Sequence, residues 1–494
     1  MKDRVLIFIL LLSLSSWAQE RSIRDEYFKE AKQSKQAYTQ EWKQNKQDYI
    51  AFRRQANMEY VENLKQAWKE YTANKKMPRP KDDAIPPVIY EGEGEKEKEA
   101  VEIPVTVLPM DEPQPQPDPI APIIENTIAN DNIEIALYNT RISIRIPKSR
   151  HISLSQLDNN AIIDAWQKMS GEDYSNLIYD CIDVRNKYAL SDWAYIRFLQ
   201  LVAEKIYGHA SNEAVLLQAF IYGQSGYSMR LAYGHDNRLY MLVESTYTIY
   251  DYDYYLINNK KFYPLNCQLN QLYITDTGFK HEKAMSLQIT TEQKLHHKSS
   301  AERTLTGKSG LSLHCSVNVN TIDFYNNYPT GHIGEDFGTR WATYANVPLE
   351  KSIRESLYPQ LKKEVAGLSE LDAVNLILNW VQTAFVYQLD DKVWGQDRAF
   401  FPSETLYYPY CDCEDRSILF SRIIRDVLGL NVVLLYYPGH LATAVQFNTD
   451  VKGDYLTVKG KKYIVCDPTY IGAPVGDTMP KMDNQSAKVI VLNR

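Results

Sequence analysis

The sequence has few cysteines, no excess of basic residues and, after residue 18, no long apolar run. Six cysteines in 494 residues are too few for a disulfide scaffold. Cys181, Cys267 and Cys315 are expected to be buried small apolar residues or to include one structural bridge. A net charge of -7 gives no reason to expect a nucleic acid partner. Since no later segment is apolar for long enough to span a bilayer, we expect no transmembrane segment.

The first residues have the features of a secretory signal peptide. The stretch MKDRVLIFILLLSLSSWAQ has a charged start, an apolar run, and small residues at Ser16 and Ala18 before Gln19. We assign residues 1–18 to a signal peptide and expect a periplasmic or secreted protein. No cysteine follows this run to serve as a lipid-anchor site.

Apolar side chains recur at helical spacing between residues 19 and 77. They are Tyr38, Trp42, Tyr49, Phe52, Tyr60, Leu64, Trp68 and Tyr71. Their spacing predicts an amphipathic helical arm, as one long helix or a helical hairpin. The stripe needs a partner surface. Packing on its own domain, or coiled-coil association with a second copy, is favoured over binding to a membrane surface, and a protein partner remains open.

Residues 78–125 are rich in Pro, Glu, Lys and Asp, as in EGEGEKEKEA and DEPQPQPDPIAP. Such a composition buries too little apolar surface to offset the entropy of ordering, and proline runs favour extended chain. We therefore predict a linker that acts as a plain tether.

The chain after the linker predicts an α+β fold with an internal repeat. In residues 126–270 and again in 346–494, a helix, a loop, a second helix closing at a glycine, an apolar strand and a later Lys-Lys-aromatic strand follow in the same order. Matching Gly226 to Gly429 places Ala210 where Cys413 stands. The first copy would then be degenerate, without a nucleophile.

Residues 271–345 alternate like strands and are expected to form a mostly β connecting region. The adjacent His296 and His297 are interpreted as solvated strand residues, because neighbouring side chains on a strand point to opposite faces and cannot both bind one ion. No calcium loop or other metal constellation is evident, so we predict no metal and no cofactor.

The C-terminal region contains a candidate thiol nucleophile. Apolar residues from Ser417 to Leu428 follow a helical pattern that ends at Gly429, which places Cys413 at the start of the helix. A helix N-terminus favours the thiolate and lowers the pKa of a cysteine. Asp412, Glu414 and Asp415 act in the opposite direction, so an imidazolium partner is needed.

His440 and Asp467 are the candidate partners. His440 follows Pro438-Gly439 and opens an apolar strand, and Asp467 ends the strand KKYIVCD. The intervening hairpin pattern predicts that these strands are antiparallel neighbours, so the two side chains can pair. Cys411 and Cys466 are interpreted as structural, although a disulfide between Cys411 and either Cys413 or Cys466 remains open.

Three segments together resemble the transglutaminase-like superfamily: DCEDRSILFSRIIRDVLGL, GHLATAV and VCDPTY. The resemblance implies a papain-like α+β core over residues 346–494, with Cys413 as nucleophile, His440 as base and Asp467 as orienting acid. The sequence departs from the family pattern at Asp412, where Gly is commoner, and at Arg416, where an aromatic residue is frequent.

The resemblance implies a cysteine peptidase or amidase, or a protein transamidase, that acts on peptide or glutamine-type amides of a peptide or protein substrate. Hydrolysis is favoured over cross-linking. Trp394 and the stretch FFPSETLYYPY either line the cleft or pack under a loop. Two other functions remain open: a non-catalytic envelope scaffold that retains the fold, and peptide capture without turnover.

Overall fold

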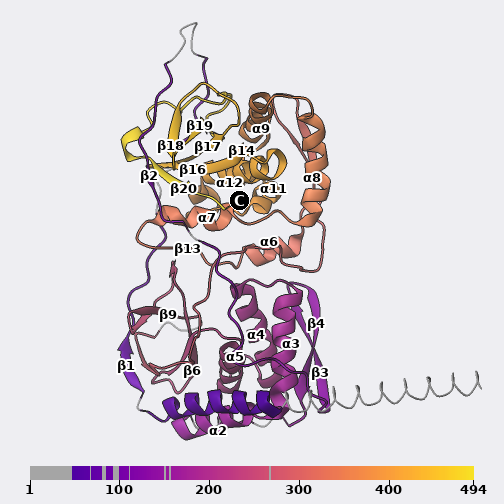
Figure 1. Ribbon diagram of the computed structural model, residues 1–494, viewed down its shortest axis with the longest axis vertical. Coiled ribbons are helices and arrows are strands. Elements are labelled where there is room, and N and C mark those ends of the chain that lie inside the picture. Colours follow the sequence, from indigo (N-terminus) through magenta and orange to yellow (C-terminus); the bar gives the residue numbers. More distant parts are fainter. Residues whose placement is uncertain are drawn as a thin grey trace, which may run out of the picture.

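Two lobes make up the molecule, each built around its own six-stranded sheet (Figure 1). The computed structural model describes residues 47–66, 68–80, 85–92, 99–110, 112–149, 152–154, 157–265 and 269–493. The predicted signal peptide, the part of the predicted arm before residue 47, and Cys267 lie outside these ranges. Within them the protein is a mixture of helices and sheets, as the α+β expectation required, and no helix combines the length and apolarity needed to cross a membrane.

The first lobe packs helices against one sheet. Its sheet has the order β1-β10-β5-β6-β9-β8. The strands are β1 (Lys69–Thr72), β5 (Met229–Tyr233), β6 (Leu239–Glu244), β8 (Tyr255–Ile257), β9 (Lys260–Pro264) and β10 (Gln271–Ile274). The helices are α2 (Asn159–Met169), α3 (Ser175–Lys187), α4 (Asp192–Tyr207) and α5 (Asn212–Gln224), with the short η1 (Glu172–Tyr174). A hairpin of β3 (Asn130–Leu137) and β4 (Thr140–Pro147) packs beside α3.

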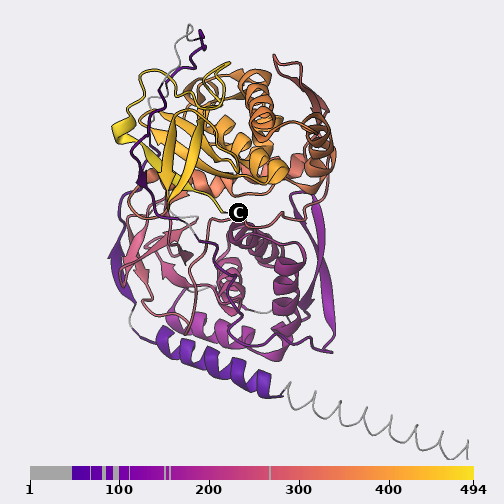
Figure 2. The same cartoon turned by 45° about the horizontal axis from the view of Figure 1, so that its top comes forward.

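The second lobe has the sheet order β18-β19-β17-β16-β20-β2. Its strands are β2 (Thr106–Val107), β16 (Asn431–Tyr437), β17 (His440–Gln446), β18 (Tyr455–Val458), β19 (Lys461–Cys466) and β20 (Lys488–Val491). The helices are α6 (Val319–Tyr325), α7 (Arg340–Ala345), α8 (Lys351–Glu364), α9 (Glu370–Ala384), α10 (Asp390–Val393), α11 (Pro402–Tyr407) and α12 (Cys413–Ile423). Helix α12 lies against β17 and α11 in the centre of this lobe (Figures 1 and 2).

Small elements complete the two lobes. They are β7 (Thr248–Ile249), β11 (Arg303–Thr306), β12 (Ser312–Cys315), β13 (Gly331–His332), β14 (Val386–Tyr387), β15 (Tyr410–Cys411), η2 (Phe337–Thr339), η3 (Ile424–Leu428) and η4 (Asn484–Ser486). The short pairs β7–β13, β11–β12 and β14–β15 are separate from the large sheets. Strand β14 lies beside β15, just before the start of α12.

The two sheets have corresponding strand orders. The run β10-β5-β6-β9-β8 in the first lobe matches β20-β16-β17-β19-β18 in the second, and every neighbour within each run is antiparallel. Only the outermost contact differs, because β1 is antiparallel to β10 whereas β2 is parallel to β20. The recurring order of elements predicted from the sequence is therefore present as a recurring topology.

The predicted match of Ala210 to Cys413 is wrong, because the helices that correspond do not begin at these two residues. Helix α5 begins at Asn212 after its N-cap Ser211, and α12 begins at Cys413 after its N-cap Asp412. The error arises because α12 continues into the π-helical turn η3 before Gly429, so counting back from the glycine overruns the start of the shorter α5. Asn212 is the residue that corresponds to Cys413, and it also lacks a thiol.

The helix over residues 47–64 packs on the first lobe of its own chain (Figure 1). Arg53 donates to the Gly171 carbonyl at 2.8 Å, Asn57 bonds Gln224, and Tyr60 stacks on Phe279 at 4.5 Å. Of the described stripe residues, Tyr60 and Leu64 are buried on the surface of their own chain, whereas Phe52 is 57% exposed. The predicted arm nevertheless ends too late, because residues 69–72 form β1 and pair with β10.

The prediction that residues 78–125 are a plain tether is wrong for the described part. This segment lies along both lobes and joins their cores (Figure 1). Ile103 and Leu108 are buried, β2 pairs with β20, and the Ile85 amide donates to the Gly439 carbonyl at 2.9 Å. Average composition concealed the alternation in EIPVTVL, which suits an edge strand.

Residues 271–345 are not a mostly β connection. Strand β10 belongs to the first sheet, and α6 and α7 pack on α11 and α12 of the second lobe. The run NVNTIDFY forms α6 instead of a strand, because the Asn318 side chain accepts from the Asn320 amide and caps the helix. His296 and His297 are exposed, as expected, but lie in irregular chain.

Candidate functional site

The start of α12 holds Cys413 in place. The Asp412 side chain accepts from the Glu414 amide at 3.1 Å and the Asp415 amide at 3.4 Å, while Asp415 accepts from the Asp412 amide at 3.1 Å. This reciprocal cap fixes the first turn of the helix. Cys413 is the first helical residue and is 4% exposed. The predicted position of Cys413 at a helix start is confirmed.

His440 and Asp467 pair directly. Strands β17 and β19 are antiparallel neighbours, and their register continued by one residue places Asp467 opposite Ala442, two residues from His440 on the same face. The His440 Nε2 atom is 2.8 Å from Asp467 Oδ2, and both side chains are buried. Asp467 Oδ1 accepts from the amides of Thr469 and Tyr470. The strand pairing and the contact that the sequence predicted are confirmed.

Cys413 shares a cavity with His440. A space of about 480 Å³ is lined by Cys413, His440 and Trp341, among other residues. Within the described residues, His440 Nδ1 is buried without a hydrogen-bond partner, and no hydrogen bond joins it to the Cys413 thiol. The histidine is therefore oriented through Nε2, and its second nitrogen is the one left for a proton.

The expectation of a lowered thiol pKa is wrong for this state of the protein. Burial raises the pKa of Cys413 well above its ordinary value, and the Asp412 and Glu414 carboxylates raise it further. A hydrogen bond from the Leu441 backbone lowers the same pKa but does not outweigh these effects. The helix start therefore holds a neutral thiol in the resting site, and ionisation needs a positive partner.

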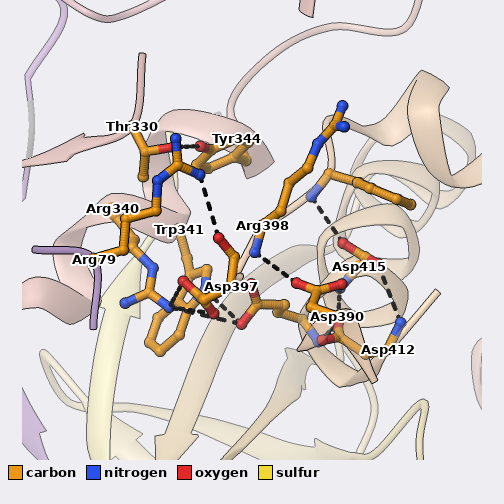
Figure 3. Close-up of polar contacts among 12 residues, drawn as sticks. Arg79, Thr330, Arg340, Trp341, Tyr344, Asp390, Asp397, Arg398, Asp412 and Asp415 are labelled. Atoms are coloured by element: carbon orange, nitrogen blue, oxygen red, sulfur yellow. Dashed lines mark hydrogen bonds and ion pairs between the residues drawn. The ribbon is translucent and has the colours of Figure 1, made fainter. Parts of the chain in front are cut away.

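Acidic side chains line part of the cavity, among them Asp390, Asp397 and Asp412, which Figure 3 shows with their polar contacts. Arg340 pairs with Asp397 at 3.0 Å and approaches Glu414 at 3.9 Å, and the Trp341 indole N–H donates to Glu414 at 3.1 Å. Burial, with Glu414 next, raises the pKa of Asp390. Sequence reasoning missed this wall, because most of it comes from residues 389–397, which carried no recognisable motif.

Two further residues that the sequence did not single out support the triad geometry. Gln382 of α9 donates to the carbonyls of Asp467 and Ala473, and accepts from the Gly472 amide. It fixes the loop that carries Asp467. Arg416, noted as a departure from the family pattern, donates to the carbonyls of Gln382 and Phe385 and so ties α12 to the end of α9.

The described cysteines form no disulfide, and the aromatic stretch is packed within the second lobe. Among the described cysteines, Cys181, Cys315, Cys411, Cys413 and Cys466 are all buried and free. Of the two interpretations of the aromatic stretch, packing is correct, since Phe401 stacks on Tyr325 at 4.1 Å and Trp394 contacts Phe400 and Tyr408. The cavity is lined instead by Leu389–Asp391 and Gly395–Asp397.

The first lobe has none of the three candidate groups at the corresponding positions. A space of about 540 Å³ in this lobe is lined by residues of α4, α5 and β6 and of the loops before α5 and β6, with Leu239 but neither Asn212 nor Leu265 among them. Asn212 corresponds to Cys413, Leu239 opens β6 as His440 opens β17, and Leu265 follows β9 as Asp467 follows β19. This lobe therefore cannot carry out thiol chemistry with these positions.

Comparisons with known proteins found no matching family model, no matching curated protein and no matching solved structure.

Proposed function

We propose that this protein is an exported, transglutaminase-like thiol enzyme that hydrolyses peptide or glutamine-type amide bonds. One observation carries the proposal: His440, which is paired with the buried Asp467, lines the same cavity as Cys413, and Cys413 stands at the start of a helix. A nucleophile, a base and a group that orients the base are the parts that acyl transfer by a thiol requires.

The reaction begins with proton transfer from the Cys413 thiol to His440 Nδ1, since Nε2 is engaged by Asp467. The thiolate sulfur attacks the amide carbon, and the C–N bond breaks as the imidazolium returns its proton to the leaving amine. Water then attacks the thioester with His440 as base, which releases the acid and restores the thiol. Asp467 stabilises the charged imidazole in both steps.

The start of α12 also supplies a donor for the oxyanion. The Glu414 and Asp415 amides donate to the Asp412 side chain, whereas the Cys413 amide donates no hydrogen bond within the described chain. A free amide at the nucleophile itself is suited to stabilise the charge that develops on the substrate oxygen. The partial positive charge of the helix start acts in the same direction.

A non-catalytic envelope scaffold is the second candidate, and one observation favours it. The pKa of Cys413 is raised, and the thiol has no hydrogen bond to His440 in this state. A scaffold that had lost activity would show the same arrangement. Under the enzyme proposal, the free protein also samples a state in which the Cys413 thiol reaches His440 Nδ1 and transfers its proton, and this state is the one that reacts.

Thiol labelling tests the proposal. Cys413 should react with iodoacetamide at neutral pH faster than an exposed reference cysteine introduced by Asp450→Cys, and His440→Ala should abolish the difference. Peptide mapping by mass spectrometry assigns the label to Cys413. If Cys413 reacts no faster than the reference and His440→Ala leaves its rate unchanged, the protein is not a thiol enzyme of this kind.

A further inference from the structure

Three carboxylates line one wall of the cavity that contains Cys413. Asp390, Asp412 and Glu414 each place an oxygen within 4.8 Å of the others, and all three line the cavity with Cys413 and His440. Their exposed fractions are 7%, 4% and 4%. Carboxylates this close and this buried are costly unless a proton or a cation compensates them.

The protein itself meets only part of that demand. Asp390 Oδ2 accepts from the Arg398 amide at 2.6 Å, and Asp412 Oδ1 accepts from two amides of its own helix (Figure 3). Among the residues that the structure describes, Asp390 Oδ1 and Asp412 Oδ2 receive no hydrogen bond, and neither side chain is in an ion pair. Two carboxylates, each more than nine-tenths buried, therefore present an unpartnered oxygen at the cavity.

His440 gives a separate indication of a polar ligand. Its ring lines the same cavity and is 1% exposed, and its Nδ1 atom has no partner among the described residues. A buried ring nitrogen without a partner costs about 1–3 kcal/mol. A ligand with a polar group near Cys413 and a positive charge near the carboxylates would satisfy both sets of atoms.

We propose that Asp390, Asp412 and Glu414 form a subsite that binds a primary ammonium group of the substrate beside Cys413. The inference rests on the proposed function, because it names the substrate class for that thiol chemistry. An ammonium has three N–H donors and no acceptor, which matches three converging carboxylates. The carboxylates keep the amine protonated and non-nucleophilic, so this group is recognised by the enzyme and does not attack the thioester.

The protonation of the empty subsite agrees with this role. Burial and the nearby carboxylates raise the pKa of both Asp390 and Asp412, so the empty cluster retains protons. A bound ammonium would replace them. A divalent cation would satisfy the same oxygens, and the experiment below separates the two ligands.

Two methanethiosulfonate reagents of opposite charge test the subsite without any turnover. With both the 2-aminoethyl and the 2-sulfonatoethyl reagent, the Cys413 thiolate attacks the sulfenyl sulfur, a disulfide forms and methanesulfinate leaves. The thiolate fraction therefore cancels from the ratio of the 2-aminoethyl rate to the 2-sulfonatoethyl rate. We expect this ratio at Cys413 to exceed that of an exposed Asp450→Cys thiol by at least about tenfold, which corresponds to about 1.4 kcal/mol.

Asp390→Asn and Asp412→Asn should each lower the Cys413 ratio several-fold, and Asn at 412 can still cap α12. Asp450→Asn, at a surface position, is the matched control and should leave the ratio unchanged. A Cys413 ratio equal to that of the reference thiol overturns the subsite. The subsite is also overturned if millimolar Ca²⁺ or Mg²⁺ lowers the Cys413 ratio to the reference value and calorimetry shows metal binding that Asp390→Asn abolishes. That result assigns the carboxylates to a metal.

The failure of the subsite and the failure of the proposed function give different results. An absent acyl-enzyme with a high ratio would reject the enzyme and keep the cation subsite. An acyl-enzyme on Cys413 with a ratio equal to the reference would keep the enzyme and reject the subsite.

Discussion

Replacing Asp467 with Asn should hinder the ionisation of the Cys413 thiol, because it favours the His440 tautomer that cannot accept the thiol proton. Asp467 Oδ1 accepts from the Thr469 and Tyr470 amides, and an Asn oxygen can keep both bonds. The Asn amide nitrogen then faces His440 Nε2, so Nε2 must accept and the ring proton moves to Nδ1. The nitrogen that should take the thiol proton is then already protonated.

The size of the effect follows from the geometry. The Nε2–Oδ2 distance is 2.8 Å and both groups are buried, so their charge centres are about 4 Å apart. At an effective dielectric constant of about 20, opposite charges at that distance attract by about 4 kcal/mol. Since about 1.4 kcal/mol is a factor of ten, the thiolate–imidazolium pair should be less populated by about a hundredfold to a thousandfold.

The assay is the rate of Cys413 alkylation by iodoacetamide, followed from neutral to alkaline pH and assigned by peptide mass spectrometry. The wild-type protein should react at neutral pH, whereas Asp467→Asn should react only as the thiol itself ionises at high pH. Asp450→Asn, in which an exposed acid is changed, is the control. A folded Asp467→Asn protein with the wild-type rate and pH profile would refute the reasoning.

Three further predictions concern the scaffold. Burial raises the pKa of Glu350 to about 7, so the folded state keeps a proton that the unfolded state loses near 4.5, and stability should fall as pH rises between these values. In urea unfolding, Glu350→Gln should remove up to about 3 kcal/mol of that fall, and an unchanged dependence of the unfolding free energy on pH would contradict the prediction. Gln382→Ala leaves two buried carbonyls and one amide unpaired, so it should lower the free energy of unfolding by about 2–4 kcal/mol and slow the alkylation of Cys413. A variant that unfolds and is labelled like the wild type would contradict this. In Gly226→Ala the new Cβ would lie 1.9 Å from the Asp118 carbonyl oxygen at a φ of +89°, so residues 112–125 should be displaced and become sensitive to limited proteolysis, unless that segment does not pack on the first lobe in solution.

The local features of the site could be predicted from the sequence. Gly429 and the apolar pattern before it locate the start of α12, and the hairpin pattern before KKYIVCD makes β17 and β19 neighbours. These features depend on residues close together in the chain, where spacing alone decides which face and which end a side chain occupies. That is why Cys413, His440 and Asp467 were found.

The features that depend on distant contacts could not be predicted. Residues 389–397 approach Cys413 only after folding, and the burial that most strongly raises the pKa of the Cys413 thiol is also produced by the fold. Composition suggested that residues 78–125 were a tether, but the edge of β20 supplies a pairing partner for β2. The π-helical turn after α12 displaced the alignment of the two lobes without leaving a sequence signal.

The central claim is most directly tested by trapping the acyl-enzyme. The full chain should be mixed with a peptide library that includes members with and without a primary amine, quenched in acid, and mapped by mass spectrometry. The account predicts an acyl adduct on Cys413 that hydroxylamine removes, and that is absent in Cys413→Ser and reduced in His440→Ala. Peptide hydrolysis that persists in Cys413→Ser, or a wild-type protein that forms no adduct with any member, would contradict it.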